Sequence, residues 1–250
     1  MDLAGRTAIV TGGARRLGRE IALDLAGCGV NVVINYRRSA GAAAQTVAEL
    51  SALGVGALAV QADVGDYRQV QGMVEAAVER FGGIDILVNN AAPFLTHTVP
   101  TDDLSAWHES INTMVHGPFY CANLVAPVML ERGGGVIIGI GDLSGEEAWA
   151  GYTGHAVGKG AVLSLTRQLA LELAPTIRAN AVIPGLALPV DGDTPEANRA
   201  AAMTTLLERW GTPAEMAHAV RFLIEADYIT GETIVVDGGQ RFGHRKHAHG

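Results

Sequence analysis

Two side chains that can carry protons lie four residues apart in the stretch Gly151–Lys159. They are His155 and Lys159. Residues at i and i+4 lie on one face of a helix, so the two side chains are expected to point the same way. An imidazole can donate or accept a proton near neutral pH. The pair therefore indicates general acid–base chemistry on a helix.

A glycine-rich turn near the N-terminus predicts a phosphate site. The sequence Thr11-Gly-Gly-Ala-Arg-Arg-Leu-Gly18 follows a short apolar run and leads directly into a helical pattern. Such strand-to-helix turns let the backbone approach a pyrophosphate at the helix N-terminus. We expect Gly12, Gly18 and the intervening Arg15, Arg16 and Leu17 to bind a dinucleotide.

The end of the second predicted strand indicates which dinucleotide. A site for NAD usually has Asp or Glu there, to bind the ribose 2′-hydroxyl. This strand instead ends in Tyr36, Arg37, Arg38 and Ser39. Guanidinium groups match phosphate oxygens, so Arg37, together with Ser39 and a loop arginine, would meet the 2′-phosphate of NADPH. The alternative is a solvated basic turn with no ligand.

Apolar runs and helical patterns alternate along the whole chain. The runs read as strands buried on both faces, and they cover Thr7–Val10, Asn31–Asn35, Ala57–Gln61, Ile84–Val88, Val136–Gly139, Arg178–Ile183 and Thr233–Val236. The helical segments between them cover Leu17–Cys28, Ala42–Leu53, Tyr67–Phe81, Leu104–Glu131, Gly151–Ala174 and Pro213–Glu225. This order predicts an α/β fold, a Rossmann-like doubly wound domain with a seven-stranded parallel sheet.

Three segments need separate comment. Pro118 and Pro127 predict a bend or a break in the long fourth helical segment. Leu186–Arg199 is rich in Pro, Gly and Asp; we interpret it as a surface loop that closes over a ligand or as a plain connection. We divide the chain into one domain, residues 1–240, and a histidine-containing tail, residues 241–250. The tail is expected to be a frayed terminus and not a metal site.

Composition limits the classes of function. The net charge of −8 comes without a basic stripe, which argues against nucleic acid or an anionic membrane as partner. No apolar run reaches the roughly 20 residues that span a bilayer, and the first strand begins too early to leave room for a signal peptide. Cys28 and Cys121 suggest buried thiols. We expect a cytoplasmic protein that acts on a small molecule.

These motifs, with four others, resemble those of the classical short-chain dehydrogenase/reductase family. The others are Asp63-Val64, Asn89-Asn90-Ala91, Pro184-Gly185 and Thr230-Gly231…Asp237-Gly238-Gly239, and the resemblance covers residues 3–240. It implies that Asp63 and Val64 border the adenine and that Asn89 supports the sheet near the ribose, with Ala91, Pro184 and Gly185 also at the cofactor. It further implies that Asn112 is a structural and proton-relay asparagine and that Lys159 is the catalytic lysine.

Within the family the chain is most similar to the pteridine reductases. Arg16 stands where other members have the middle glycine of the turn, Phe94 follows the Asn-Asn-Ala motif, and Asp142 replaces a serine. The resemblance implies a pterin stacked between Phe94 and the nicotinamide, with Arg16, Asp142, Tyr152 and Leu186 around it. Taken singly, Phe94 could equally be a core aromatic and Asp142 a loop cap.

His155 is the departure from the family, whose proton donor is a tyrosine at this position. An imidazole nitrogen ends roughly 2 Å short of a phenol oxygen, so a water or a deeper-lying substrate would have to bridge the gap. Three interpretations stay open. His155 is the acid, with Asp142 favouring its cationic form; or the proton comes from Asp142 through water, or from Tyr152; or redox activity is lost.

The leading hypothesis is an NADPH-dependent reductase of a flat, conjugated C=N or C=O substrate, possible substrates including pterins. One rival keeps an NADPH pocket as scaffold while His155 and Asp142 run an isomerisation or elimination. Another is a non-catalytic NADPH-binding partner of a related subunit. The apolar helical segments Leu104–Glu131 and Gly151–Ala174 resemble those that build the family's tetramers, so a homotetramer is expected by analogy.

Overall fold

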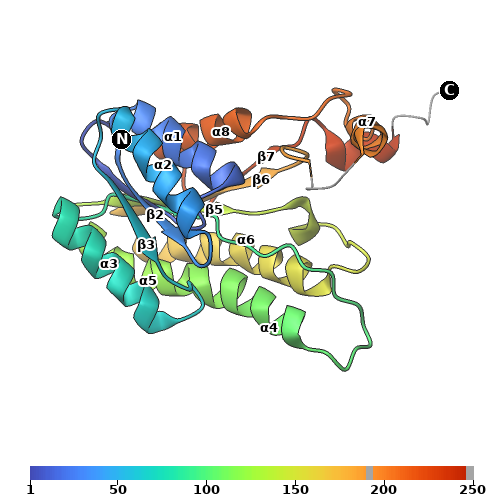
Figure 1. Cartoon of the computed structure of the whole chain (residues 1–250), viewed down its shortest axis with the longest axis horizontal. Coiled ribbons are helices and arrows are strands. Elements are labelled where there is room, and N and C mark those ends of the chain that lie inside the picture. Colours follow the sequence, from blue (N-terminus) through green and yellow to red (C-terminus); the bar gives the residue numbers. More distant parts are fainter. Residues whose placement is uncertain (190–193, 246–250) are drawn as a thin grey trace.

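A computed structural model describes residues 1–189 and 194–245 of the chain (Figure 1). Within them, the seven predicted strands form one parallel sheet, so the predicted fold class is confirmed. The strands are β1 Thr7–Val10, β2 Asn31–Tyr36, β3 Ala57–Gln61, β4 Ile86–Asn89, β5 Gly135–Ile140, β6 Ile177–Pro184 and β7 Thr233–Val236.

The strand order places a switch point in the middle of the sheet. The order is β3-β2-β1-β4-β5-β6-β7, so the chain winds outward from β1 in one direction and from β4 in the other. In the register of the central pair, Ala8 lies opposite Ile86 and Val10 opposite Val88. Loops that leave β1 and β4 diverge there, which opens a crevice at the carboxyl ends of the strands.

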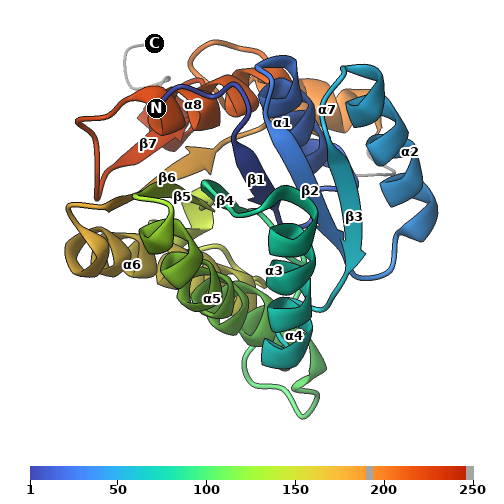
Figure 2. The same ribbon diagram turned by 90° about the vertical axis from the view of Figure 1, so that its left-hand side faces the viewer.

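Helices cover both faces of the sheet (Figure 2). On one face lie α1 Arg16–Gly27, α2 Ala40–Ala52 and α8 Pro213–Glu225; on the other lie α3 Tyr67–Phe81, α5 Gly117–Glu131 and α6 Thr153–Leu173. The predicted bounds of α3 and α8 match the observed ones, because the side chains of Asp66 and Thr212 cap their N-termini. The predicted end at Glu131 also matches the end of α5, and the outer ends of the other predicted helical segments are displaced by one or two residues.

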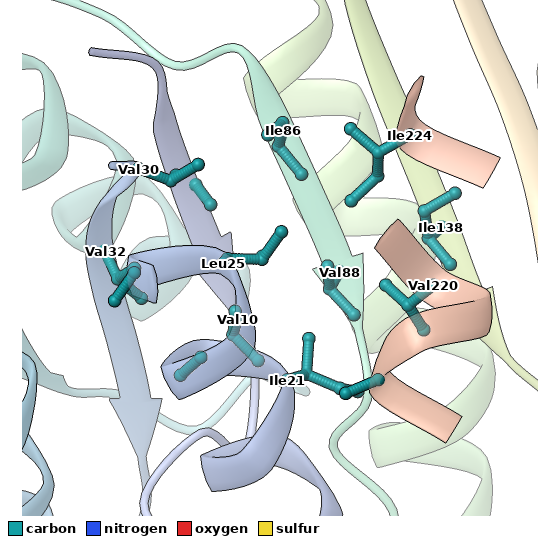
Figure 3. Close-up of a cluster of buried hydrophobic side chains, with 14 of the residues drawn as sticks. Val10, Ile21, Leu25, Val30, Val32, Ile86, Val88, Ile138, Val220 and Ile224 are labelled. Atoms are coloured by element: carbon teal, nitrogen blue, oxygen red, sulfur yellow. The ribbon is translucent and has the colours of Figure 1, made fainter. Parts of the chain in front are cut away.

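Buried aliphatic side chains fill the layer between the sheet and the α1–α8 pair (Figure 3). Alternate residues of each strand face this layer, as the twofold period of a strand requires. The labelled members are Val10, Ile21, Leu25, Val30, Val32, Ile86, Val88, Ile138, Val220 and Ile224. Each such side chain stabilises the fold by about 1.5–3 kcal/mol relative to an exposed one, so the strand ends that carry the site rest on a rigid base.

The predicted break in the fourth helical segment is present, and it takes an unexpected form. Helix α4 (Ser105–Ile111) runs into a π-helical turn, η1 (Asn112–His116), before α5 begins. The Gly117 N–H donates to the Asn112 carbonyl, five residues back. Pro118 lacks an N–H and would crowd the carbonyl four residues before it, and a wider turn relieves this. Pro127 lies inside α5 without ending it.

Two of the irregular segments are more ordered than predicted. The expected loop Leu186–Arg199 contains the start of helix α7 (Pro195–Ala202), because the Thr194 hydroxyl accepts the Ala197 N–H at 3.2 Å and Pro195 suits a first turn. Residues 190–193, with Asp191, lie outside the described residues. The first part of the predicted tail forms a 3-10 helix, η3 (Gln240–Arg245); His247 and His249 also lie outside.

Candidate functional site

A cavity of about 490 Å³ opens at the switch point between β1 and β4, a size typical of small-molecule sites. Most of the predicted cofactor residues line it: Gly12, Arg15, Arg16, Leu17, Gly18, Tyr36, Arg37, Arg38, Ser39, Asp63, Val64, Ala91, Lys159 and Pro184. Asp142 and His155 line it as well. The structure thus brings the glycine turn, the basic turn and the proton-carrying residues together.

The glycine turn is packed too tightly for side chains. Gly12 has φ +62°, and a Cβ on Gly18 would collide with the Gly12 carbonyl and come within 2.5 Å of Asn90 Nδ2. Asn90 Nδ2 donates to the Thr11 carbonyl at 2.9 Å, and Asn35 Oδ1 accepts the Gly12 N–H at 3.3 Å. This bracing holds a bare backbone at the N-terminus of α1, a geometry that fits a pyrophosphate.

Arg16 stands in the left-handed region of backbone space, with φ +52°. This conformation favours glycine and costs a side-chain-bearing residue roughly 1–2 kcal/mol. A glycine at this point of the turn would avoid the strain. The Arg16 guanidinium donates to the Pro189 carbonyl at 3.0 Å. It therefore links the glycine turn to the segment that follows β6.

The basic turn after β2 contains one arginine that is ion-paired and one for which no ion pair is found among the described residues. Arg37 is held by two carboxylates: Asp63 at 3.4 Å, and Glu109, which accepts a short hydrogen bond. Hydrogen bonding to Glu109 raises the pKa of Arg37. Arg38 is exposed and lines the cavity, beside Ser39, which precedes α2 without capping it. The ion pairs of Arg37 therefore compete with its predicted contact to a 2′-phosphate. Arg38 and Ser39 offer a second position where an anion could bind.

Lys159 is buried beneath the cavity. Its side chain is 5% exposed, and Nζ donates to the carbonyl of Ile140 at 2.8 Å, where β5 ends. Burial lowers the pKa of Lys159 to about 8, although the nearby Asp142 carboxylate opposes the shift. An ammonium with one hydrogen-bond acceptor among the described residues has donors left for ribose hydroxyls.

The two carboxylate oxygens of Asp142 make different contacts: one caps a turn and the other faces His155. Oδ1 accepts the Ser144 N–H at 2.8 Å and so caps the short turn η2 (Leu143–Gly145), which confirms the loop-cap interpretation. Oδ2 faces His155 Nε2 at 3.8 Å, beyond direct hydrogen-bond range. Burial alone would raise the pKa of Asp142, but interactions with His155, Ser144 and Lys159 outweigh it and hold the pKa below its usual value. Asp142 is therefore an anion at neutral pH.

His155 is 3% exposed and has one partner and one free nitrogen. Nδ1 lies 3.1 Å from the Pro93 carbonyl, while Nε2 has no hydrogen-bond partner among the described residues. A carbonyl can only accept, so Nδ1 carries a proton. Nε2 is then either a bare lone pair or, in the cation, an N–H aimed toward Asp142. The arrangement can bind a proton at Nε2 and release it into the cavity.

An aromatic wall adjoins these groups. Phe94 stacks on Tyr152 with ring centroids 4.8 Å apart and meets the His155 ring edge-on at 5.0 Å. Trp149 contacts Tyr152 at 6.2 Å. Phe94 is 51% exposed, which excludes its interpretation as a core aromatic. One face of its ring is covered by Tyr152, and a flat ligand would have to use the other.

Comparison with known proteins gives a consistent result. A family profile described as Enoyl-(Acyl carrier protein) reductase matches residues 12–241. The chain is 36% identical to the 3-oxoacyl-[acyl-carrier-protein] reductase FabG of Staphylococcus aureus, over 94% of this chain and 97% of that protein. It is 33% identical to the FolM alternative dihydrofolate reductase 1 of Brucella canis, solved with NADP, with a TM-score of 0.89 and coverage of 97% and 96% of the two chains.

A third likeness extends the range of chemistry. The 3beta-hydroxysteroid dehydrogenase 1 of Eggerthella lenta is 35% identical, over 95% of this chain and 94% of that protein. The chain belongs to the short-chain dehydrogenase/reductase family. It is an NAD(P)-dependent oxidoreductase. The family motifs of this chain line the cavity at the switch point of the sheet.

Some residues that the family resemblance assigned to the site lie elsewhere. Asn112 is exposed at the start of η1 and is not among the described residues that line the cavity. The residue of this segment that faces α6 is Met114, which is buried and would lie 2.8 Å from a Cβ on Gly158. The placement does not support a proton relay through the side chain of Asn112.

Five further assignments need correction or qualification. Asn89 and Gly185 are not among the described residues that line the cavity, and Asn89 Nδ2 donates to the Pro118 carbonyl at 3.4 Å. Leu186 lines a separate cavity of about 110 Å³. Tyr152 precedes α6, which begins at Thr153 and not at the expected Gly151. Phe94 and Tyr152 flank the main cavity and do not belong to its lining.

The structure also places residues at the site that sequence reasoning missed. Glu109 and Thr113 reach it from α4 and η1, and Asn35, Asn90 and Pro93 brace it. Asn90 stood in the Asn-Asn-Ala motif and could have been found. Glu109 lies 72 positions from Arg37, and nothing in the sequence indicates their pairing. Among the described residues, no three His, Cys, Asp or Glu side chains gather in a group that could hold a metal ion, and no helix is long and apolar enough to cross a membrane.

Proposed function

We propose that the protein is an NADPH-dependent reductase of a planar, conjugated C=N or C=O substrate, a pterin or a similar cyclic imine or ketone. The observation that carries the proposal is the contact of His155 with both Asp142 and Phe94. It sets a proton carrier that lines the cofactor cavity beside an exposed aromatic ring. The similarity to FolM, whose structure holds NADP, supports the substrate class.

The residues present fit the cofactor. The bare turn at Gly12–Gly18 suits the pyrophosphate, the basic turn at Arg37–Ser39 suits a 2′-phosphate, and Lys159 has donors for the nicotinamide ribose. When bound, NADPH supplies hydride. The protein residues have to hold the substrate, exclude water and deliver one proton.

We assign the proton to His155 Nε2. Pro93 fixes the ring orientation through Nδ1, so Nε2 alone can exchange a proton with a ligand. Asp142 Oδ2 lies 3.8 Å from Nε2, so the ionised carboxylate can orient an N–H at that nitrogen. Asp142 is a positioning and electrostatic partner in this scheme, and Phe94 offers its open face to the substrate ring. General acid catalysis of this kind contributes about 10²–10⁴-fold to a rate.

The test is NADPH oxidation, followed optically, with dihydropterins as substrates. Turnover that is lost in His155→Ala while NADPH still binds would support the proposal. Tight NADPH binding without turnover would overturn the pterin assignment. A reaction that depends on His155 but consumes no cofactor would favour the isomerase or lyase alternative, because Nε2 can also act as a base. Cofactor binding with no turnover on any substrate class would favour a non-catalytic partner.

We also propose that the protein is a homotetramer that pairs through α5 and α6. Phe119 on α5 and Val157 and Leu171 on α6 are exposed apolar side chains on these helices. Light scattering should give a mass close to four times 26.0 kDa. Phe119→Glu should lower that mass, whereas Leu53→Glu, at an exposed apolar position after α2, should not. A monomeric wild type would overturn the proposal.

A further inference from the structure

Arg37 reaches the cavity already neutralised. Its Nη1 lies 3.4 Å from Asp63 Oδ2, and its Nη2 donates to Glu109 Oε1. Arg37 and Glu109 are each about one-third exposed (33% and 32%), so the pair is partly shielded from water. Both residues line the cavity, on the side where Arg38 and Ser39 also lie.

Glu109 is the unusual member of this pair. Asp63 follows β3 and belongs to the rim of the sheet, whereas Glu109 comes from α4, on a different layer of the fold. A carboxylate at this end of a cavity repels a phosphate and, at the same time, occupies the guanidinium group that would bind it. A hydroxyl in place of the phosphate would meet no such opposition, because a carboxylate can accept a hydroxyl hydrogen bond.

We propose that Glu109 is a cofactor-selectivity residue, whose carboxylate competes with the 2′-phosphate of NADPH for Arg37. Glu109 thereby weakens the preference for NADPH over NADH that the basic turn creates. With the ion pair closed, Arg37 is neutralised and the 2′-phosphate relies on Arg38 and Ser39. With the pair opened, Arg37 adds a second guanidinium to that position. The inference rests on the NADPH preference proposed above and is independent of the substrate.

The test measures fragments of the cofactor, which separates it from catalysis. Calorimetry at fixed ionic strength compares adenosine 2′,5′-bisphosphate with adenosine 5′-monophosphate, which lacks the 2′-phosphate. In Glu109→Gln, a shape-conserving change that removes the charge, the bisphosphate should bind about 3- to 10-fold more tightly. The monophosphate should change less than about 2-fold, since it offers no phosphate to the released arginine.

A double-mutant cycle separates competition for Arg37 from simple charge repulsion. If Glu109 acts mainly by holding Arg37, its substitution should have a much smaller effect on bisphosphate binding in an Arg37→Met background, where only direct charge repulsion is removed. A gain of equal size there would overturn the inference, as would an unchanged or weaker affinity in Glu109→Gln alone. Glu131→Gln, at an exposed position at the end of α5, is the matched control and should bind as the wild type does.

Failure of the inference and failure of the NADPH proposal look different in these data. If wild-type protein binds the bisphosphate no better than the monophosphate, the predicted preference for a 2′-phosphate is wrong and the inference falls with it. If the preference is present but insensitive to Glu109, only the inference is wrong.

Discussion

The Pro93 carbonyl, 3.1 Å from His155 Nδ1, fixes which imidazole nitrogen can exchange a proton with a ligand. Because Nδ1 must carry a hydrogen to donate to the carbonyl, Nε2 is the ring nitrogen that can gain or lose a proton. The backbone of the segment after β4 therefore sets the chemistry of a side chain on α6.

His155→Asn should separate the two functions of the imidazole. The Asn amide nitrogen can occupy the position of Nδ1 and donate to Pro93, but it leaves nothing at Nε2. We expect turnover to fall by about 10²–10⁴-fold while the melting temperature and NADPH affinity stay near wild type. Unchanged turnover in His155→Asn would exclude His155 as the donor.

His155→Phe is the companion to this variant. It removes the donor as well and leaves the part-buried Pro93 carbonyl without its partner, which should cost about 1 kcal/mol of unfolding free energy. Denaturant titration checks the difference. Equal stability of the Asn and Phe variants would mean that the contact with Pro93 does not orient the ring.

Lys159→Met should stabilise the apoprotein while it abolishes activity. Burial lowers the pKa of Lys159 from 10.5 to about 8, so keeping its charge costs about 3 kcal/mol at neutral pH. Loss of the hydrogen bond to Ile140 destabilises the variant by about 1 kcal/mol and offsets part of this gain. We expect a net gain of about 2 kcal/mol at pH 7 in urea titrations. A less stable variant would mean that the contacts of the ammonium stabilise the fold by more than its burial destabilises it.

The pH dependence gives a second test of the same group. The folded pKa lies below the unfolded one, so between pH 8 and 10.5 the unfolded chain binds more protons. The unfolding free energy of the wild type should therefore rise with pH across this window, and the penalty is constant below it. Lys159→Met should lack that rise. Parallel curves for the two proteins would contradict the lowered pKa.

Arg16→Gly should be more stable than Arg16→Ala, the reverse of their order in an ordinary helix. Both variants lose the guanidinium and its contact with Pro189, so they differ only in the backbone preferences of glycine and alanine. At φ +52° glycine avoids roughly 1–2 kcal/mol that alanine retains, whereas helix propensity favours alanine by about 1 kcal/mol. Denaturant titration should give the glycine variant the larger unfolding free energy. Glu208→Gly against Glu208→Ala, at φ +55° and away from the cavity, is the matched control and should follow the same order.

The sequence predicts the fold better than it predicts the neighbours of the site. Strands buried on both faces read as continuous apolar runs, and the glycine turn lies where its flanking elements place it. The error at Asn112 has a physical cause. A π-helical turn adds a residue to the helix and rotates the following face, so a 3.6-residue period carried through residues 104–131 cannot identify Met114 as the residue facing α6.

Glu109 shows a different limit. Its contact with Arg37 joins α4 to the end of β2 and depends on how two layers meet. No local pattern encodes such a pairing, whereas the His155–Lys159 relation follows from one helix and was predictable. Asp142 lies between these cases: its capping contact is local, and its approach to His155 is set by how η2 packs on α6.

His97→Phe should stabilise the protein, because the imidazole is buried with both nitrogens unpartnered among the described residues. It lies between β4 and α4, against the Trp107 ring at 6.1 Å, and its backbone N–H donates to the Gly151 carbonyl at 2.7 Å. An apolar ring keeps the packing and removes two desolvated polar atoms, for a gain of about 1 kcal/mol in thermal or urea unfolding. His116→Phe, on an exposed histidine stacked on Tyr120, should change little. Destabilisation of His97→Phe alone would show that bound water satisfies these nitrogens in solution.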